Sequence, residues 1–158
     1  SGGPCAVAYL DLDNFKAFND AHGFLRGDKV ILLLATALRR AIVGVVPPAF
    51  IGHVGGDDFV LVCRPDQVED LSRAAVGYFD DHVPALHDAD EVARGYLEMA
   101  DRLGVLRQYP LVSVSVGIAT SERRTFSDYR EVVVVATEMK GVAKGASGSA
   151  IAVDRRAV

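Results

Sequence analysis

The chain has 158 residues, half of them hydrophobic, and a formal net charge of −4. This length is typical of one globular domain, so we expect residues 1–158 to form a single domain, with residues 1–4 as a linker. The acidic balance argues against nucleic-acid binding, which needs a basic face. Two cysteines are too few for a disulfide scaffold or a structural zinc site. The apolar stretch 30–46 is interrupted by Arg39 and Arg40, so we expect a core helix and no membrane insertion.

The first half of the chain alternates apolar runs with helical periodicity and turn residues. An acid after the first apolar run, Asp13, is expected to cap a short helix that Gly23 ends. The expected elements are a strand over 5–11, a helix to residue 22, a helix from about 27 to 43, and two strands, 50–54 and 59–63, that form a hairpin.

The second half is expected to begin with a helix over 64–82, followed by a polar surface loop at 87–91. Residues 92–109 fit either one helix or a hairpin of 96–100 and 105–109, and the hairpin is favoured because 101–104 (DRLG) can turn. The remaining expected elements are a strand over 111–118, a helix capped by Ser127 and a short strand over 149–153.

Acidic residues stand at the ends of two expected strands, Asp11 after the first and Asp57 and Asp58 in the turn Gly-Gly-Asp-Asp. If the first two strands are neighbours, Asp11 and Asp57 end at the same edge of the sheet. Carboxylates are ligands that Mg²⁺ prefers, although the tetrapeptide alone is also typical of any polar hairpin. The element order predicts an α+β fold, a ferredoxin-like core with helices flanking a central, mostly antiparallel sheet.

Several motifs in this order resemble one family, the GGDEF family of bacterial diguanylate cyclases. They are residues 11–20 (DLDNFKAFND), 27–28 (GD), 55–59 (GGDDF), 113–118 (SVSVGI) and 143–144 (AK). The resemblance implies a nucleotidyl-cyclase palm and a cytoplasmic domain that condenses two GTP molecules into cyclic di-GMP with release of two pyrophosphates. It also implies that a homodimer is required for catalysis, and that a sensory or EAL-type domain is attached in the full-length protein.

The same resemblance implies a metal centre. Asp11, the backbone carbonyl of Leu12, and Asp57 would bind Mg²⁺ or Mn²⁺, and Asp57 and Asp58 would be the catalytic acids. The cation would neutralise the triphosphate and lower the pKa of the attacking 3′-hydroxyl.

The resemblance further implies a GTP-binding site. Asn19 and Asp28 match the residues that read guanine in the family, and leaving their polar groups unpaired would reject adenine. The triphosphate would be bound by the backbone N–H groups of Phe15 and Lys16, by Gly55 and Gly56, by Lys144 and by Lys140.

Departures from the family pattern leave the activity open. Asp58 stands where the family has glutamate, which withdraws the carboxylate by roughly 1.5 Å, and Gly148 stands at a phosphate-binding arginine. The stretch 46–49 (VPPA) lacks the Arg-x-x-Asp site of product inhibition, so no feedback is expected there. The alternatives are an active cyclase, which we favour, a GTP-binding regulatory module of little turnover, and a purely structural unit.

Overall fold

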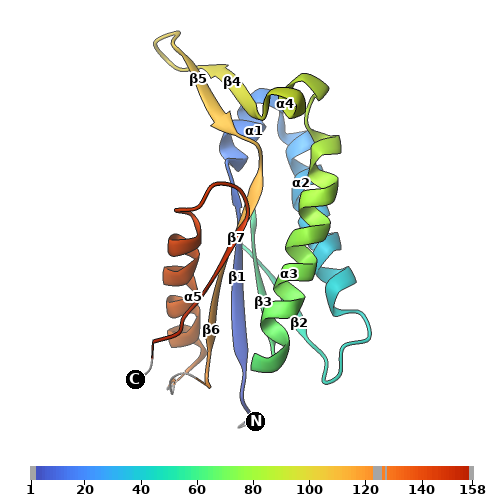
Figure 1. Ribbon diagram of the computed structural model, residues 1–158, viewed down its shortest axis with the longest axis vertical. Helices are drawn as coiled ribbons and strands as arrows, with labels where there is room; N and C mark the ends of the chain where they lie inside the picture. The colour runs from blue at the N-terminus through green and yellow to red at the C-terminus, as the bar shows by residue number, and fades with distance from the viewer. Residues whose placement is uncertain (1–2, 123–125, 127, 157–158) are drawn as a thin grey trace.

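The structure is a computed structural model that describes residues 3–122, 126 and 128–156. A five-stranded sheet with the order β2-β3-β1-β6-β7 forms its centre, and only β6 and β7 run parallel (Figure 1). The strands are β1 (Ala6–Asp13), β2 (Phe50–Val54), β3 (Asp58–Cys63), β6 (Ser113–Thr120) and β7 (Ala150–Val153). The α+β expectation, with a mostly antiparallel sheet flanked by helices, is therefore confirmed.

Helices cover both faces of this sheet (Figure 1). α2 (Phe24–Ile42) and α3 (Pro65–His82) pack side by side on one face, and α5 (Tyr129–Ala143) lies on the other. The main core lies between the sheet and α2 and α3, where Leu10, Leu34 and Phe79 are fully buried. Burying such side chains is the dominant stabilising contribution in a domain of this size.

β1 lies at the centre of the sheet because its apolar residues alternate with polar ones on the α5 side. It pairs with β3 and β6, and β2 is an edge strand that pairs only with β3 among the described residues. The condition that the first two strands are neighbours is not met, because β3 lies between β1 and β2. Asp11 nevertheless reaches the acidic turn, because its cross-strand partner is Asp58 at the start of β3.

Two helix starts differ from the expectations. Asp13 is the last residue of β1 and not a cap, and α1 (Phe15–His22) follows Asn14, which adopts a left-handed conformation with φ of 63°. α2 starts at Phe24 and not near Gly27, because Gly23 alone makes the turn between the two helices. At α5, the expected cap Ser127 lies outside the described residues, and the Asp128 carboxylate accepts the hydrogen bond of the Arg130 N–H.

The polar stretch after α3 is not a surface loop. Residues 83–94 form the 3₁₀ helix η1 (Val83–Leu86) and the short helix α4 (Ala89–Arg94), and His87 and Glu91 are buried there. The prediction of a surface loop was wrong because the side chains of His87 and Glu91 form hydrogen bonds with each other and with His22 of α1. Burial therefore does not leave them unpaired.

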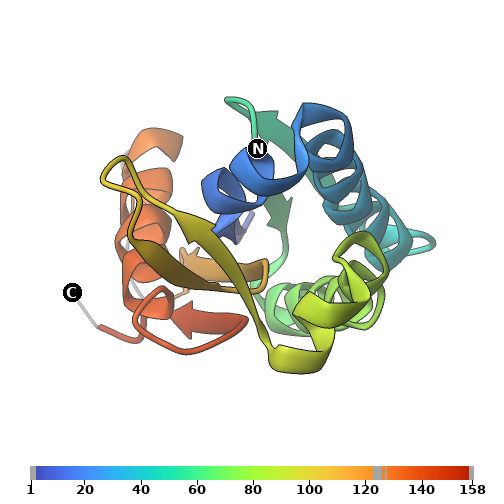
Figure 2. The same ribbon diagram turned by 90° about the horizontal axis from the view of Figure 1, so that it is seen from above.

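The expected hairpin is confirmed as β4 (Tyr96–Ala100) and β5 (Leu106–Pro110). The Asp101 carboxylate holds its turn by accepting from the Leu103 and Val105 N–H groups at 2.9 and 3.0 Å. Seen from above, the hairpin extends from the α4 side across the end of the sheet toward α5 (Figure 2). It therefore covers the end of the molecule at which α1 begins.

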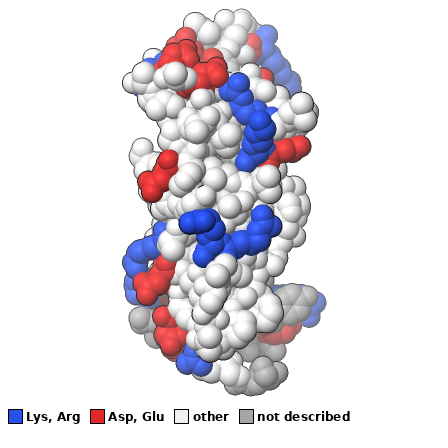
Figure 3. Space-filling model, turned by 90° about the vertical axis from the view of Figure 1, so that its right-hand side faces the viewer, with Lys and Arg blue, Asp and Glu red and all other residues white. Residues whose placement is uncertain are grey.

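No helix among the described residues is long and apolar enough to cross a bilayer. On the face formed by α2 and α3, acidic and basic side chains are scattered among neutral ones, without a continuous basic surface (Figure 3).

The close approach of α5 to β6 requires glycine at residue 117. A Cβ atom there would overlap the α5 backbone at Ala136 and Lys140. We predict that Gly117→Ala lowers the free energy of unfolding by about 2–3 kcal/mol, because α5 must shift off the sheet. Urea unfolding measures this loss. Gly77→Ala, at an exposed α3 position with open space around it, is the control and should stabilise by up to about 1 kcal/mol. Equal effects of the two changes would contradict the assigned packing of α5.

Candidate functional site

One face of β1 carries the polar residues of the site. Tyr9, Asp11 and Asp13 alternate with buried Leu10 and Leu12, so the first three point toward α5 and the other two toward the main core. Asp11 and Asp13 lie near the end of the strand.

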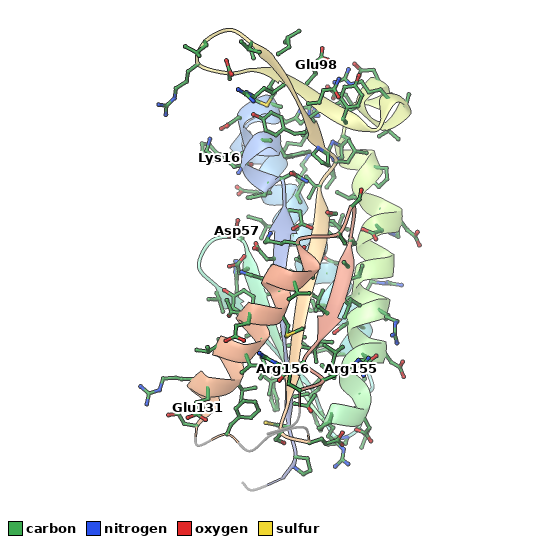
Figure 4. The ribbon with its side chains drawn as sticks, turned by 60° about the vertical axis from the view of Figure 1, so that its left-hand side comes forward. Lys16, Asp57, Glu98, Glu131, Arg155 and Arg156 are labelled. Carbon is green, nitrogen blue, oxygen red and sulfur yellow. The ribbon has the colours of Figure 1, made fainter. Side chains whose placement is uncertain are left out.

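Three carboxylates converge at this end of the sheet. Asp11 is directly opposite Asp58 in the β1–β3 ladder, and Asp57 is the last residue of the turn between β2 and β3. One carboxylate oxygen from each of the three lies within 4.8 Å of the other two. In Figure 4, Asp57 stands at the tip of its turn, below Lys16 on α1. The structure therefore brings the predicted metal and catalytic acids together.

Two lysines at the end of α5, Lys140 in its last turn and Lys144 at its C-cap, pair with acids of β1. Lys140 Nζ lies 3.3 Å from Asp11 Oδ2 and 4.5 Å from the centre of the Tyr9 ring. Lys144 Nζ lies 3.0 Å from Asp11 Oδ2 and 2.8 Å from Asp13 Oδ1. Spacing by four residues puts both lysines on one helix face, one turn apart.

The pKa values of Asp11 and Asp58 are shifted in opposite directions. Burial works against ionisation of Asp11, but hydrogen bonds from Asp58 and Lys144 and the charges of both lysines hold the pKa of Asp11 below its ordinary value. Burial, and then the neighbouring Asp11 carboxylate, raise the pKa of Asp58 to about 6. The Tyr9 hydroxyl donates to Asp58 Oδ2 at 2.9 Å and partly offsets this rise. Asp11 is therefore the member of the pair that loses its proton first.

The donor set fits a hard divalent cation. When Asp58 is ionised, its Oδ1 is buried and has no hydrogen-bond donor. A cation would satisfy that oxygen, and carboxylates are ligands that Mg²⁺ and Mn²⁺ accept. Leu12 lies one residue past the last β1–β3 pair, so β3 does not cover its backbone there. Its carbonyl as a metal ligand stays a prediction.

The predicted base-reading residues come from the junction of α1 and α2. Asn19 lies against Gly27, where any side chain would collide with the Asn19 amide, and its Oδ1 is buried without a hydrogen-bond partner. Asp28 is exposed and lines a hollow of about 640 Å³ between α2 and the β2–β3 hairpin, which His53 and Phe59 also line. Of the two predicted base-reading residues, only Asp28 lines this hollow, whereas Asn19 contributes a buried polar atom without a partner, which is unfavourable unless a ligand supplies one.

The predicted phosphate contacts at α1 have free donors. Asn14 makes no side-chain cap, so the first N–H groups of α1, those of Phe15 and Lys16 included, have no intrahelical acceptor. The Phe15 side chain itself packs against the core. Lys16 is exposed and ion-paired to Asp20 at 2.9 Å.

The turn at Gly55 and Gly56 has open space around it and is stabilised by His53. Gly55 has a φ of 61°, which favours glycine, and Gly56 has open space around the position of a side chain. His53 Nε2 lies 3.1 Å from the Gly56 carbonyl oxygen, and its ring stacks on Phe59 at 4.5 Å. Because no side chain covers the turn at Gly55 and Gly56, a ligand can approach its backbone closely.

Comparison with known proteins assigns the family. Residues 1–78 match the family described as "Diguanylate cyclase, GGDEF domain". The chain carries a GGDEF domain. The GGDEF domain of DgcB from Caulobacter crescentus, solved with c-di-GMP, has the same fold, with a TM-score of 0.67 and 22% identity over 96% of this chain and 78% of that chain.

Curated relatives match parts of the chain. An uncharacterized signaling protein of Caulobacter vibrioides is 44% identical over 62 residues, which are 39% of this chain and 7% of that protein. The diguanylate cyclase DgcP of Pseudomonas aeruginosa is 38% identical over 68 residues, 43% of this chain and 10% of that protein. The GGDEF domain thus spans a small part of the length of these relatives.

The departure at Gly148 has a structural reason. This residue has a φ of 77°, a conformation that an arginine would adopt only under strain. It lines a hollow of about 280 Å³ together with Asp13, Asn14 and Lys144. Arg155 and Arg156 lie far from this hollow, toward the lower end of the molecule in Figure 4, where Arg155 is ion-paired with Glu69 and Arg156 with Asp154 and Glu138, so neither replaces the missing guanidinium.

Sequence reasoning missed Tyr9 and Asp13 as residues of this GGDEF site. Asp13 accepts from Ser113 and Ser115 at 2.7 and 2.8 Å as well as from Lys144. The signal was present, because residues two apart on a strand share a face with Asp11. The cap preference of aspartate concealed it for Asp13.

The raised pKa of Asp58 predicts a pH dependence for the metal-free domain. Its folded pKa of about 6 exceeds the value near 3.8 of an unperturbed carboxyl, so the folded chain binds the proton more tightly. In EDTA, protonation of Asp58 should contribute a gain of about 1 kcal/mol as the pH falls from 7 to 4, less than the full shift implies because solvent screens the site. The lowered pKa of buried His87 opposes this gain over the same range, and that of Asp11 opposes it from about pH 5 downward, so the gain is measured relative to Asp58→Asn.

Urea unfolding at several pH values measures this gain. In Asp58→Asn the gain should vanish, whereas Asp70→Asn on the exposed side of α3 should keep it. A gain that persists in Asp58→Asn would show that another group is responsible.

Proposed function

We propose that this GGDEF domain is a diguanylate cyclase, which condenses two GTP molecules into cyclic di-GMP and releases two pyrophosphates. The observation that carries the proposal is the convergence of Asp11, Asp57 and Asp58 within 4.8 Å, beside two lysines of α5. Phosphoryl transfer from a nucleoside triphosphate depends on such a combination of acids for a cation and lysines for phosphate. The likeness to a named diguanylate cyclase over 68 residues supports the same reaction.

In this proposal the acids hold the cation. Asp11, Asp57 and the Leu12 carbonyl are the ligands of Mg²⁺ or Mn²⁺, and Asp58 stands beside Asp11. When bound, the ion supplies charge neutralisation of the triphosphate and a lowered pKa for the attacking hydroxyl. Lys140 and Lys144, now paired with Asp11, would be free to contact phosphate oxygens once a cation balances that carboxylate.

The other site residues hold the nucleotide. Asn19 and Asp28 pair with the polar edge of guanine, and the orphan Oδ1 of Asn19 gains a donor from the base. The N–H groups of Phe15 and Lys16 bind phosphate, and Gly55 and Gly56 let the turn approach it.

Each domain holds one GTP, so two copies must face each other as a homodimer. Each 3′-oxygen then bonds to the α-phosphorus of the other nucleotide, pyrophosphate leaves, and the hydroxyl proton passes to solvent. Proximity of this kind supplies a large part of the rate of a two-substrate reaction. We further propose a cytoplasmic site of action, where GTP is available, and attached sensory or EAL-type domains, since the curated relatives are far longer.

A second candidate function is a GTP-binding regulatory module with little turnover. Two observations favour it. Asp58, on β3, is held against β1 by the Tyr9 hydroxyl, and Gly148 offers no guanidinium to the hollow beside Asp13 and Lys144. Both changes weaken catalytic contacts and leave Asp11, Asp57, Asn19 and Asp28 in place for binding.

Metal-dependent GTP binding should require Asp57. With Mg²⁺ and GTP at about 100 times the dissociation constant, the melting temperature should rise by about 5–10 °C, and Asp57→Asn should abolish the rise. The matched control, Asp70→Asn on α3, should keep it. A rise of the same size in Asp57→Asn, or none in the unchanged domain, would defeat GTP binding at this site.

Turnover should depend on the length of the acid at residue 58. At high protein concentration with GTP and Mg²⁺ or Mn²⁺, the domain should form cyclic di-GMP and pyrophosphate, and Asp58→Glu should raise the rate about tenfold by extending the carboxylate beyond Tyr9. Chromatography of the products measures this. GTP binding without product in both proteins would favour the regulatory module.

A further inference from the structure

A buried polar cluster outside the candidate site joins α1 to α4. Its members are His22, the last residue of α1, and His87 and Glu91. The Glu91 carboxylate lies 2.8 and 3.0 Å from His22 Nε2, 3.2 Å from His87 Nδ1 and 3.0 Å from the Asp88 N–H. The side chains of His22 and Glu91 are each 7% exposed and that of His87 is 0% exposed. One buried carboxylate thus accepts from three donors.

The outer contacts of the two imidazoles fix their protons. The Arg26 guanidinium donates to His22 Nδ1 at 2.9 Å, and the Val112 N–H donates to His87 Nε2 at 3.3 Å. Guanidinium and amide N–H groups only donate, so each of these ring nitrogens must accept. The proton of each neutral imidazole is therefore on the other nitrogen, where it points at Glu91.

The same protons argue against a metal ion here. Ligand atoms of His22, His87 and Glu91 lie within 4.8 Å of one another, as a metal centre would need. A histidine that binds a metal donates its other N–H to an acceptor, whereas both outer partners here are donors. The cluster is a hydrogen-bonded clamp, which we call the Glu91 clamp.

The Glu91 clamp acts on the turn that carries the base-reading residues. His22 lies three residues after Asn19, and Arg26 lies two residues before Asp28. Arg26 is also held from α4, by an ion pair with Asp88 at 2.8 Å. Both ends of the α1–α2 turn are therefore tied to the same short segment.

The buried amide of Asn19 is held in an unfavourable position. Its Oδ1 is buried without a donor, which is unfavourable, so other contacts must stabilise the α1–α2 junction that buries it. Phe18, next to Asn19, is fully buried with its ring 4.8 Å from that of His22 and 5.1 Å from that of His87. The clamp and this aromatic packing hold α1 in the orientation that leaves Asn19 unpaired.

We propose that Glu91 is a positioning residue for base recognition, which fixes the α1–α2 turn so that Asn19 and Asp28 meet one guanine. This inference rests on the proposed function, since it assumes that the site binds GTP. Glu91 touches no nucleotide and acts through His22 and, together with Asp88, through Arg26.

The test compares the binding of two nucleotides that cannot condense, 3′-deoxyGTP and 3′-deoxyATP, by calorimetry with Mg²⁺. In Glu91→Gln, the affinity for 3′-deoxyGTP should fall about tenfold and that for 3′-deoxyATP should stay within twofold. The matched control is Leu71→Ala at a buried α3 position, which should lower the melting temperature without changing the ratio of the two affinities. A merely structural role of Glu91 would give the same pattern as this control.

An unchanged ratio in folded Glu91→Gln, or an equal loss for both nucleotides, would overturn the inference and leave the proposed function intact. Failure of the unchanged domain to bind 3′-deoxyGTP would overturn the proposed function and the inference with it. Should Glu91→Gln not fold, Asp88→Asn keeps a good helix cap and breaks the ion pair with Arg26. That variant should lower the ratio about threefold, and an unchanged ratio would count against the clamp.

Discussion

The ion pairs of Lys140 and Lys144 with Asp11 are the interaction on which the site depends. Asp11, Asp57 and Asp58 lie close enough for repulsion to matter, and burial makes the charges of Asp11 and Asp58 more costly. Without a cation, the domain balances them in two ways: Lys140 and Lys144 pair with Asp11, and Asp58 holds its proton up to a pH of about 6.

The fold delivers this balance through two close contacts. The β1–β3 register places Asp58 directly opposite Asp11, and apolar side chains that must face the core fix that register. Gly117 on β6 lets α5 approach the sheet at Ala136 and Lys140, so the lysines reach across to β1. Acids and lysines distant in sequence thus meet because both contacts are made by the central strands.

The sequence sufficed to predict what depends on local pattern. The hairpin of residues 55 and 56, the helices α2 and α3 and the acids Asp11 and Asp57 followed from apolar periodicity, glycines and motif spacing. The pairing of β1 with β3 could not, because strand order is decided by contacts distant along the chain.

The burial of polar residues could not be predicted from the sequence, for a physical reason. His87 and Glu91 read as a solvated loop, since a polar letter predicts exposure unless its partner is known. Their partners, His22 and Val112, come from elements more than 20 residues away. Asp13 was misread in the same way, because its ties to Ser113 and Lys144 outweigh the local preference for a cap.

The effect of aspartate at residue 58 depends on its hydrogen bond with the Tyr9 hydroxyl. An aspartate at this position is short enough for Tyr9 to hold it against β1, 2.9 Å from its hydroxyl. Burial, and then the hydrogen bond to Asp58, raise the pKa of Tyr9 to about 12. Asp57 stands outside that contact at the tip of the turn (Figure 4), and Asn19 and Asp28 lie on α1 and α2. Changes at residue 58 therefore leave these other site residues in place. A GGDEF domain built in this way can lose turnover and keep its ligand, so binding alone does not establish that it is a cyclase.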